Sequence, residues 1–266
     1  MNIQDFRGQW ALVTGASSGI GAEFCKQLAS LEVNLVLVAR RDDNMQLLAA
    51  QLQSEHHIRT LVLPYDLAES GCPRALKESV QSKNIKIRLL VNNAAYGPWG
   101  SFGKTSAESY EKLCQLVMGT PIALCREFLD DLSSFSGAAI INLSSPAALQ
   151  PVPYKAAYSA AKTGLHFFSL ALYEELKYRN IYVQTLMPGP TQSELDEKGN
   201  AYKSALAEER RLPSEIVNAS LAAFTKKQPF VTTAKGTYKQ RLFTGLFPIK
   251  FVLKTVAQMF KPPENR

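Results

Sequence analysis

Short runs of consecutive apolar residues alternate with amphipathic stretches along the first two thirds of the chain. Continuous apolar runs are typical of strands covered on both faces, whereas apolar positions spaced by three or four residues are typical of helices packed by one face. The pattern predicts strands at 10–15, 34–40, 59–67, 87–95, 137–145 and 181–189, and helices at 22–31, 44–55, 75–82 and from about 154 to 178. This alternation indicates an α/β fold, with a parallel sheet between two layers of helices.

The chain has 266 residues, of which 46% are hydrophobic and 20% charged, so it can bury a large core. This length suits one α/β domain, and we expect a single domain over residues 1–266. No apolar run is long enough to span a bilayer, and the first ten residues lack the basic-then-apolar order of a secretory signal. We therefore expect a cytoplasmic protein.

The net charge of +7 is concentrated near the C-terminus. From Ile216 to Pro263 there is no Asp or Glu, whereas the basic residues there are Lys226, Lys227, Lys235, Lys239, Arg241, Lys250, Lys254 and Lys261. These bases and the aromatic residues among them form no nucleic-acid-binding motif, so we expect no nucleic-acid partner.

Cysteine and histidine positions argue against disulfides and metal sites. No Cys-x-x-Cys pair occurs, and an apolar setting predicts reduced, mostly buried thiols for Cys25, Cys72, Cys114 and Cys125. Two of the three histidines are adjacent, at His56 and His57, and none has the spacing of a zinc or iron site. We expect no metal cofactor.

A glycine-rich turn, "TGASSGIG", stands between the first predicted strand and the first predicted helix. Glycine tolerates positive φ and lets backbone N–H groups approach a pyrophosphate, and a helix N-terminus adds partial positive charge. The alternative is a glycine-rich turn that binds nothing. Its position at the start of a helix in an α/β chain favours phosphate binding.

Further motifs follow in order: Asp66 in "YDL", "NNAA" at 92–95, Ser145 in "INLSS", "YSAAK" at 158–162 and "PGPT" at 188–191. With the Gly-x-x-x-Gly-x-Gly turn, they resemble the short-chain dehydrogenase/reductase family from about Trp10 to Thr191. A "QPVPY" segment at 150–154 is similar to reductases of that family. The resemblance implies a Rossmann-like doubly wound sheet, a nicotinamide cofactor, a small-molecule carbonyl or alcohol substrate of intermediate size, and a homodimer or homotetramer.

The resemblance also implies cofactor contacts. It assigns the phosphate-binding turn to Gly15, Ser17, Ser18, Gly19, Ile20 and Gly21, the adenine end to Asp66 and Leu67, the nicotinamide ribose to Asn93 and Ala94, and the carboxamide to Pro188, Gly189 and Thr191.

The end of the second strand indicates which nicotinamide cofactor is used. An acidic residue there binds the ribose diol of NAD, whereas an Arg holds the 2′-phosphate of NADP. The strand ends with Arg40, and an Arg fork binds phosphate well, so we expect NADP(H) rather than NAD(H). The alternative is that Arg40 and Arg41 are a solvated pair beside Asp42 and Asp43.

Two tyrosines and two lysines occur within residues 154–162. Tyr158 and Lys162 are four residues apart on the predicted helix and share a face, whereas Tyr154 and Lys155 do not. A Tyr is a poor base near neutral pH, and a neighbouring cation favours its phenolate. We therefore predict Tyr158 and Lys162 as catalytic residues that also contact the cofactor, while Tyr154 either contacts substrate or packs.

Ser145 matches the family serine that positions the substrate oxygen. Alternatives are that the neighbouring Ser144 has this role, or that Ser145 only caps a turn. The predicted mechanism has Tyr158 giving its proton to the substrate oxygen while Lys162 lowers the pKa of Tyr158 and binds the ribose hydroxyls.

One position departs from the family pattern. Most members carry an Asn in the helix before the serine strand, where it holds a water that relays protons to the Lys. Our alignment places Val117 there, and valine cannot hold that water. Gly119 and Pro121 are unfavourable inside a helix, so we also expect a kink.

Residues 192–215 are polar and helix-prone, at the position of the family's mobile lid over the substrate. A helix follows from about Leu212, with Ser214 predicted as its cap. The segment 216–266 ends in an amphipathic pattern whose apolar face comprises Ile249, Val252, Leu253, Val256 and Phe260. Such a basic helix either packs on its own core or a partner subunit, or lies on an anionic membrane surface near a lipid-like substrate.

The sequence therefore predicts an NADPH-dependent carbonyl reductase, or the reverse alcohol dehydrogenase, with its cofactor and catalytic core at 7–191. Two alternatives stay open. One is a slow or non-catalytic NADP-binding protein, which Val117 favours, and the other is a membrane-associated binding protein, which the tail favours.

Overall fold

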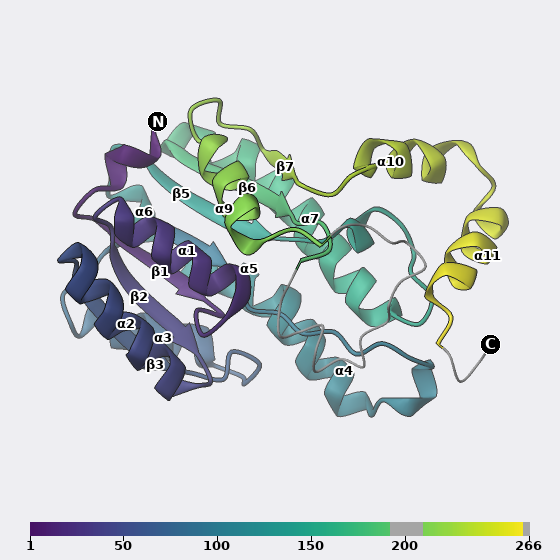
Figure 1. Ribbon diagram of the computed structural model, residues 1–266, viewed down its shortest axis with the longest axis horizontal. Coiled ribbons are helices and arrows are strands. Elements are labelled where there is room, and N and C mark those ends of the chain that lie inside the picture. Colours follow the sequence, from purple (N-terminus) through teal and green to yellow (C-terminus); the bar gives the residue numbers. More distant parts are fainter. Residues whose placement is uncertain (192–209, 263–266) are drawn as a thin grey trace.

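The computed structural model describes residues 1–191 and 210–262 (Figure 1). Within these residues a seven-stranded sheet has the order β3-β2-β1-β4-β5-β6-β7, and all strand pairs are parallel. The strands are β1 (Trp10–Thr14), β2 (Asn34–Ala39), β3 (Thr60–Pro64), β4 (Ile87–Asn92), β5 (Ala138–Leu143), β6 (Ile181–Met187) and β7 (Phe230–Thr232). The order reverses between β1 and β4, where loops leave in opposite directions and a doubly wound sheet opens a ligand crevice. The predicted fold class is confirmed.

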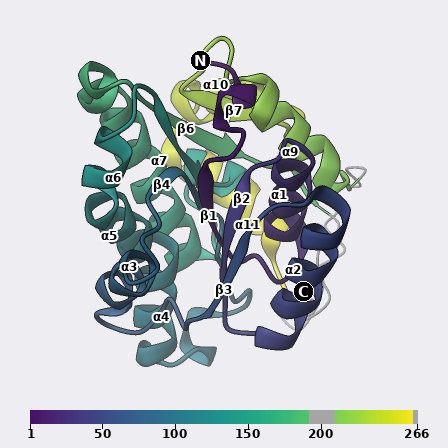
Figure 2. The ribbon, with the colours of Figure 1, turned by 90° about the vertical axis from the view of Figure 1, so that its left-hand side faces the viewer.

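Helices cover both faces of the sheet (Figure 2). One layer comprises α1 (Gly19–Ser30), α2 (Asp42–His56) and α9 (Pro213–Ala222). The other comprises α3 (Cys72–Gln81), α5 (Thr120–Glu127), α6 (Leu129–Ser133) and α7 (Ala156–Leu176). Short 3-10 turns are η1 (Ile3–Phe6), η2 (Phe102–Lys104), η4 (Pro146–Leu149) and η5 (Lys177–Arg179).

Side chains of the central strands alternate between the two layers. In β1, Ala11 and Val13 pack with Phe24 of α1, whereas Leu12 packs with Leu76 of α3. All five side chains are fully buried. Each large apolar side chain buried in this way contributes about 1.5–3 kcal/mol, so these strands supply much of the stability of the core.

The helix before β5 is interrupted. It begins as α4 (Ala107–Cys114), continues as a π-helical turn, η3 (Gln115–Gly119), and then becomes α5. Pro121 lies in the first turn of α5 and has no N–H to continue the α-helical pattern, while a π turn accommodates the mismatch. A kink was expected at Gly119 and Pro121, and the structure shows a π turn that ends at Gly119.

The C-terminal part of the described chain ends in two helices, α10 (Thr237–Leu246) and α11 (Ile249–Phe260), which we call the C-terminal arm. Figure 1 shows the arm projecting beyond the sheet, near the end of the molecule where α4 and the start of α7 lie. The predicted helix at 249–260 is confirmed, whereas α10 and the short strand β7 were not predicted. No helix in the described ranges has the length and hydrophobicity to cross a membrane.

One sequence expectation near α9 is wrong, and another falls mostly outside the described residues. The predicted cap of α9 is wrong, because Leu212 precedes the helix and Ser214 lies inside its first turn without capping it. Pro213 starts the helix instead, since proline is favoured in the first turn. Most of the predicted lid at 192–215 lies outside the described residues.

Candidate active site

The glycine-rich turn joins β1 to α1 at the carboxyl edge of the sheet. Gly15 has φ +67° and Gly19 has φ +56°, a conformation that disfavours residues with a side chain. A Cβ at Gly15 or Gly21 would approach Asn93 Nδ2 to 2.6 Å. No side chain therefore covers the backbone at the N-terminus of α1, where N–H groups without an intrahelical partner favour an anion.

Hydrogen bonds fasten this turn to the end of β4. Thr14 Oγ1 accepts from the backbone N–H groups of Asn93 (2.9 Å) and Ala94 (3.1 Å), while Asn93 Nδ2 donates to the carbonyls of Thr14 (2.9 Å) and Gly15 (3.3 Å). Asn93 and Ala94 thus reach the crevice edge, with the amide nitrogen of Asn93 holding the turn. Sequence reasoning missed Thr14, although a hydroxyl residue directly before Gly15 was a usable signal.

Both arginines after β2 lie beside this edge, in different roles. The Arg41 guanidinium donates to Ser17 Oγ (3.1 Å) and Ser18 Oγ (2.9 Å), so Arg41 extends over the glycine turn. Arg40 is exposed, and its charge opposes the rise that burial causes in the pKa of Tyr96. The structure therefore adds Arg41 to the predicted Arg40 as a candidate phosphate ligand.

Asp66 and Leu67 follow β3 on the same edge. Asp66 Oδ1 accepts from the Ala68 N–H (3.0 Å), which shapes the loop. The Leu67 carbonyl accepts from the buried Thr120 hydroxyl at 2.6 Å, which ties this loop to α5. The charges of Arg40 and Asp66 act on the pKa of Tyr96 in opposite directions, since Arg40 lowers it and Asp66 raises it.

Residues after β6 complete the edge. The Gly189 N–H donates to Thr233 Oγ1 (3.2 Å), and Thr191 Oγ1 donates to the Gly189 carbonyl (2.8 Å). A Cβ at Gly189 would lie 3.1 Å from Ala234 Cα, so Gly189 permits the close packing of this loop on the chain after β7. Thr233, which directly follows β7, is a further residue at this edge that the sequence did not reveal.

Lys162 lies on α7, buried beside the end of β5. Its Nζ donates to the Leu143 carbonyl at 2.6 Å and lies 5.8 Å from the ring centroid of Tyr158. Burial lowers the pKa of Lys162 from 10.5 to about 7. The predicted pair is thus brought together, with the lysine held by the strand.

Ser144 and Ser145 follow β5 and have different environments. Ser144 is buried, and its hydroxyl donates to the Lys162 carbonyl. Ser145 is half-buried, and its Oγ accepts a 3.2 Å hydrogen bond from the Ala147 N–H at the start of η4. Ser145 therefore caps a turn, as one alternative held, and is also the more accessible of the two hydroxyls.

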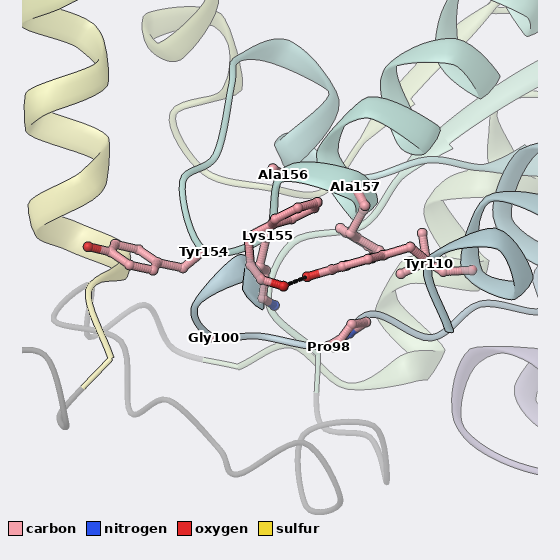
Figure 3. Close-up of a pocket in the computed structure, with 10 residues that line it drawn as sticks. Pro98, Gly100, Tyr110, Tyr154, Lys155, Ala156 and Ala157 are labelled. Carbon is pink, nitrogen blue, oxygen red and sulfur yellow. Dashed lines mark hydrogen bonds between the residues drawn. The ribbon is translucent and has the colours of Figure 1, made fainter. Parts of the chain in front are cut away.

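A pocket lies beside Tyr158, between the loop after β4, α4 and the start of α7 (Figure 3). A Cβ at Gly97 would lie 2.6 Å from the Tyr158 ring, so the loop packs directly on this ring. On the α4 side, the Tyr110 hydroxyl donates to the Phe102 carbonyl (3.0 Å).

Tyr154 and Lys155 also line the pocket. Lys155 Nζ lies 5.8 Å from the Tyr158 ring centroid, as near as Lys162 Nζ, although the sequence analysis gave Lys155 no role. Tyr154 has φ +66° and points away from the other labelled side chains toward α11 (Figure 3). Lys155 directly precedes α7 and lies three residues before Tyr158, a spacing at which side chains on a helix are neighbours.

The whole-chain comparisons identify the family. The model of the short chain dehydrogenase family matches residues 9–204. The chain belongs to this family. Its dinucleotide crevice and its Tyr158–Lys162 pair lie at the same edge of the sheet, within that matched region.

Individual relatives of this short-chain dehydrogenase are moderately similar. The chain is 28% identical over 185 residues to the very-long-chain 3-oxoacyl-CoA reductase of Bos taurus, covering 68% of this chain and 59% of that protein. It is 29% identical over 186 residues to the human inactive hydroxysteroid dehydrogenase-like protein 1, covering 68% and 55%. The chain thus spans less than two thirds of the length of these curated relatives.

A solved structure of a short-chain dehydrogenase from Sphingobium yanoikuyae, in complex with NADPH, has a TM-score of 0.79 and 27% identity. The similarity covers 90% of this chain and 96% of that one. The fold around the crevice is therefore that of a family member that binds NADPH.

Our alignment places Val117 at the position of the family Asn, and in this short-chain dehydrogenase the surroundings of Val117 are apolar. Val117 is fully buried within the π turn η3 and packs with Leu113 and Ala161, against the side chain of Tyr158. An apolar side chain therefore occupies this place beside α7, and it offers no hydrogen bond to a water.

The cysteines and the potential metal ligands were also located in the described part of the chain. All four cysteines are free, and Cys25, Cys72 and Cys125 are buried, as predicted. Burial raises the pKa of Cys125 to about 12 and that of Cys72 to about 11. Residues 1–191 and 210–262 contain no group of three or more His, Cys, Asp or Glu arranged as metal ligands.

Proposed function

We propose that this short-chain dehydrogenase is an NADPH-dependent carbonyl reductase, or the reverse alcohol dehydrogenase, acting on a ketone, aldehyde or secondary alcohol of intermediate size. The observation that carries the proposal is the pairing of Tyr158 with a buried Lys162 at the carboxyl edge of the sheet, beside the glycine turn. Similarity alone does not suffice, because one curated relative of this chain is an inactive protein.

The residues of the crevice fit a dinucleotide phosphate. Gly15 and Gly21 leave a cradle that a Cβ would fill, and the N-terminus of α1 opens onto it. The Arg41 fork lies over this cradle with Arg40 beside it, and guanidinium groups suit the 2′-phosphate of NADP(H). Bound NADPH supplies the hydride for carbonyl reduction.

The protein groups handle the proton. In the proposed reduction, the Tyr158 hydroxyl donates its proton to the carbonyl oxygen as the carbonyl carbon gains the hydride, so the product is an alcohol. The Tyr158 phenolate that remains is stabilised by the Lys162 ammonium and regains a proton from solvent. Ser145 positions the carbonyl oxygen, and Tyr154 borders the substrate pocket.

The remaining predicted contacts belong to the same proposal. Asp66 and Leu67 border the adenine end, Asn93 and Ala94 border the nicotinamide ribose, and Pro188, Gly189 and Thr191 border the carboxamide end.

The domain organisation, oligomeric state and location are also part of the proposal. The single domain comprises the core at 7–191, a substrate lid at 192–215 and the segment at 216–266. A homodimer or homotetramer is part of the proposal, supported by Phe167 on α7, which is 63% exposed. Four free thiols support a cytoplasmic location.

The test is a titration of the purified protein with NADPH and with NADH, monitored by fluorescence, followed by NADPH oxidation with a panel of ketones and aldehydes. We expect tighter binding of NADPH than of NADH, and turnover with at least one carbonyl. Equal or tighter NADH binding would refute the cofactor assignment. NADPH binding without turnover on the panel would favour the non-catalytic alternative that Val117 supports.

A further inference from the structure

The outer face of α10 is apolar and exposed to solvent. Tyr238, Leu242 and Leu246 are spaced by four residues, so they share one face of the helix. They are 72%, 61% and 70% exposed, respectively. Contiguous exposed apolar side chains of this size usually mark an interaction surface.

This apolar surface continues into α11. Phe247, Ile249 and Phe251 are each about half exposed at the junction of the two helices. The rings of Phe243 and Phe247 are 5.0 Å apart, and those of Phe247 and Phe251 are 5.5 Å apart, so the aromatic residues connect the two helices. We call the exposed apolar residues of the C-terminal arm, with the bases among them, the arm surface.

The sequence prediction for this helix is partly confirmed. Val252 and Val256 are buried against Val152, so part of the predicted apolar face packs on the chain's own core. Ile249 and Leu253, predicted for the same face, are 57% and 37% exposed. The helix is therefore anchored by one edge and leaves other apolar side chains in solvent.

The charges of the arm surface all have one sign. Lys239, Arg241, Lys250 and Lys254 are exposed, and no Asp or Glu occurs from Ile216 to Pro263. None of these four bases forms an ion pair within the described ranges of the chain. A second copy docked through this surface would bring like charges together, whereas an anionic surface would complement them.

The arm also borders the substrate pocket. Trp99, in the loop that packs on Tyr158, donates from its indole N–H to the Phe260 carbonyl at 2.9 Å. Gln240 Nε2 donates to the Pro146 carbonyl at 3.0 Å, directly after Ser145. With Tyr154 pointing toward α11, the arm surface and one wall of the pocket lie at the same end of the molecule (Figure 3).

We propose that the arm surface docks on an anionic phospholipid bilayer, with its exposed apolar and aromatic residues at the headgroup level and its lysines on the lipid phosphates. Exposed apolar and aromatic residues among lysines are the features of proteins that lie in the membrane interface. Docking brings the Tyr154 side of the pocket to the lipid surface. This favours a lipid-soluble ketone as substrate, a consequence that rests on the proposed reductase function.

The test is flotation of the purified full-length protein with vesicles of phosphatidylcholine and with vesicles of equal parts phosphatidylcholine and phosphatidylglycerol. We expect flotation with the anionic vesicles only, weakening as salt is added. Each basic residue near an anionic surface is worth about fivefold in binding, so Lys239→Gln, Lys250→Gln and Lys254→Gln together should lower binding about a hundredfold. The matched control is Lys26→Gln, Lys83→Gln and Lys86→Gln, which are exposed and lie outside the arm.

The apolar part is tested in the same way. Leu242→Ser with Leu246→Ser should abolish flotation, whereas Leu47→Ser on α2, a residue that is 73% exposed, should not. Unfolding temperature and NADPH oxidation with a water-soluble ketone, which needs no membrane, should be unchanged in the arm variants. Flotation is measured without turnover, so docking and the reductase function fail independently.

Three results would overturn the proposal. One is absence of flotation with both vesicle types, and another is equal loss of flotation in the arm and control variants. The third is self-association in sedimentation that Leu242→Ser with Leu246→Ser removes, with no vesicle binding, because a second copy would then cover the arm surface.

Discussion

The carboxyl edge of the sheet and the C-terminal arm contain the same residue types with different burial or different neighbours. At the edge, Tyr158 is packed under Gly97, Lys162 is buried and Arg41 binds the glycine turn. In the arm, Tyr238, Lys254 and Arg241 are exposed. The comparison shows that burial and neighbours, rather than residue type, decide which side chains can do chemistry. Paired substitutions at the two regions test this directly.

The tyrosine pair should give the largest contrast. Tyr158→Phe removes the proton donor, and general acid catalysis is worth about 10²–10⁴-fold, so we expect kcat to fall by that factor while NADPH affinity is nearly unchanged. Tyr238→Phe should leave kcat unchanged. Steady-state kinetics and NADPH titration of both variants check this, and wild-type turnover in Tyr158→Phe would defeat the assignment.

The glycine pair comes next. A Cβ at Gly21 would lie 2.7 Å from the Gly15 carbonyl carbon, so Gly21→Ala must displace the turn. Overpacking of this kind costs about 1–3 kcal/mol, and we expect NADPH affinity to fall about 5- to 100-fold with a lower unfolding temperature. Gly245 in α10 has no neighbour within 4 Å, so Gly245→Ala should preserve affinity and slightly stabilise the helix. Equal effects of the two changes on NADPH binding would contradict the cradle.

The arginine pair tests cofactor choice. Arg41→Ala removes a fork from the glycine turn, and a hydrogen bond to a charged group is worth about 1.5–3 kcal/mol, so NADPH affinity should drop about tenfold or more. NADH affinity should stay the same, and Arg241→Ala should change neither. If Arg40→Ala lowers NADPH affinity and Arg41→Ala does not, the original assignment to Arg40 alone holds.

The lysine pair has the smallest effect at any single pH step and is measured without cofactor. Burial lowers the pKa of Lys162 from 10.5 to about 7, so between these pH values the unfolded chain binds one proton more than the folded chain. Burying Lys162 therefore lowers the free energy of unfolding most below a pH of about 7, and this cost disappears as the pH rises to 10.5. The free energy of unfolding should rise relative to Lys162→Met by about 1 kcal/mol per pH unit in this window. Lys254→Met should show no such difference in urea unfolding, and a flat difference for Lys162→Met would mean that Lys162 is not desolvated.

Strands and layers were predictable because each central strand is buried on both faces. The run "NLVLVA" in β2 is buried along its whole length, and continuous apolar runs of this kind are typical of strands buried on both faces. β7 was missed because it has three residues and only Val231 is buried. The cap of α9 was misplaced because Pro213 starts that helix without a side-chain cap.

Site residues were predictable where covalent geometry or helical spacing leaves few choices. Gly15 and Gly19 need positive φ, and Tyr158 with Lys162 needs one helical turn. Thr14 and Arg41 were missed because their hydrogen bonds join segments that are distant along the chain, which periodicity cannot reveal. Lys155 was missed although it lies three residues before Tyr158, a spacing at which side chains on a helix are neighbours.

The arm shows the limit of pattern alone. Its amphipathic sequence fitted both self-packing and membrane contact, and the structure combines buried Val252 and Val256 with exposed Leu242 and Leu246. The sequence pattern indicates how much apolar surface a helix has, whereas tertiary packing decides how much of that surface is buried.

The central claim is hydride transfer at the Tyr158–Lys162 edge. The most direct measurement is a reaction with NADPH that carries deuterium at its transferable nicotinamide position, using a carbonyl that the panel identifies as a substrate, followed by mass spectrometry of the product. We predict an alcohol with one deuterium on the former carbonyl carbon in wild type, and almost none with Tyr158→Phe at equal NADPH occupancy. An alcohol without deuterium, or equal labelling by both proteins, would contradict the account.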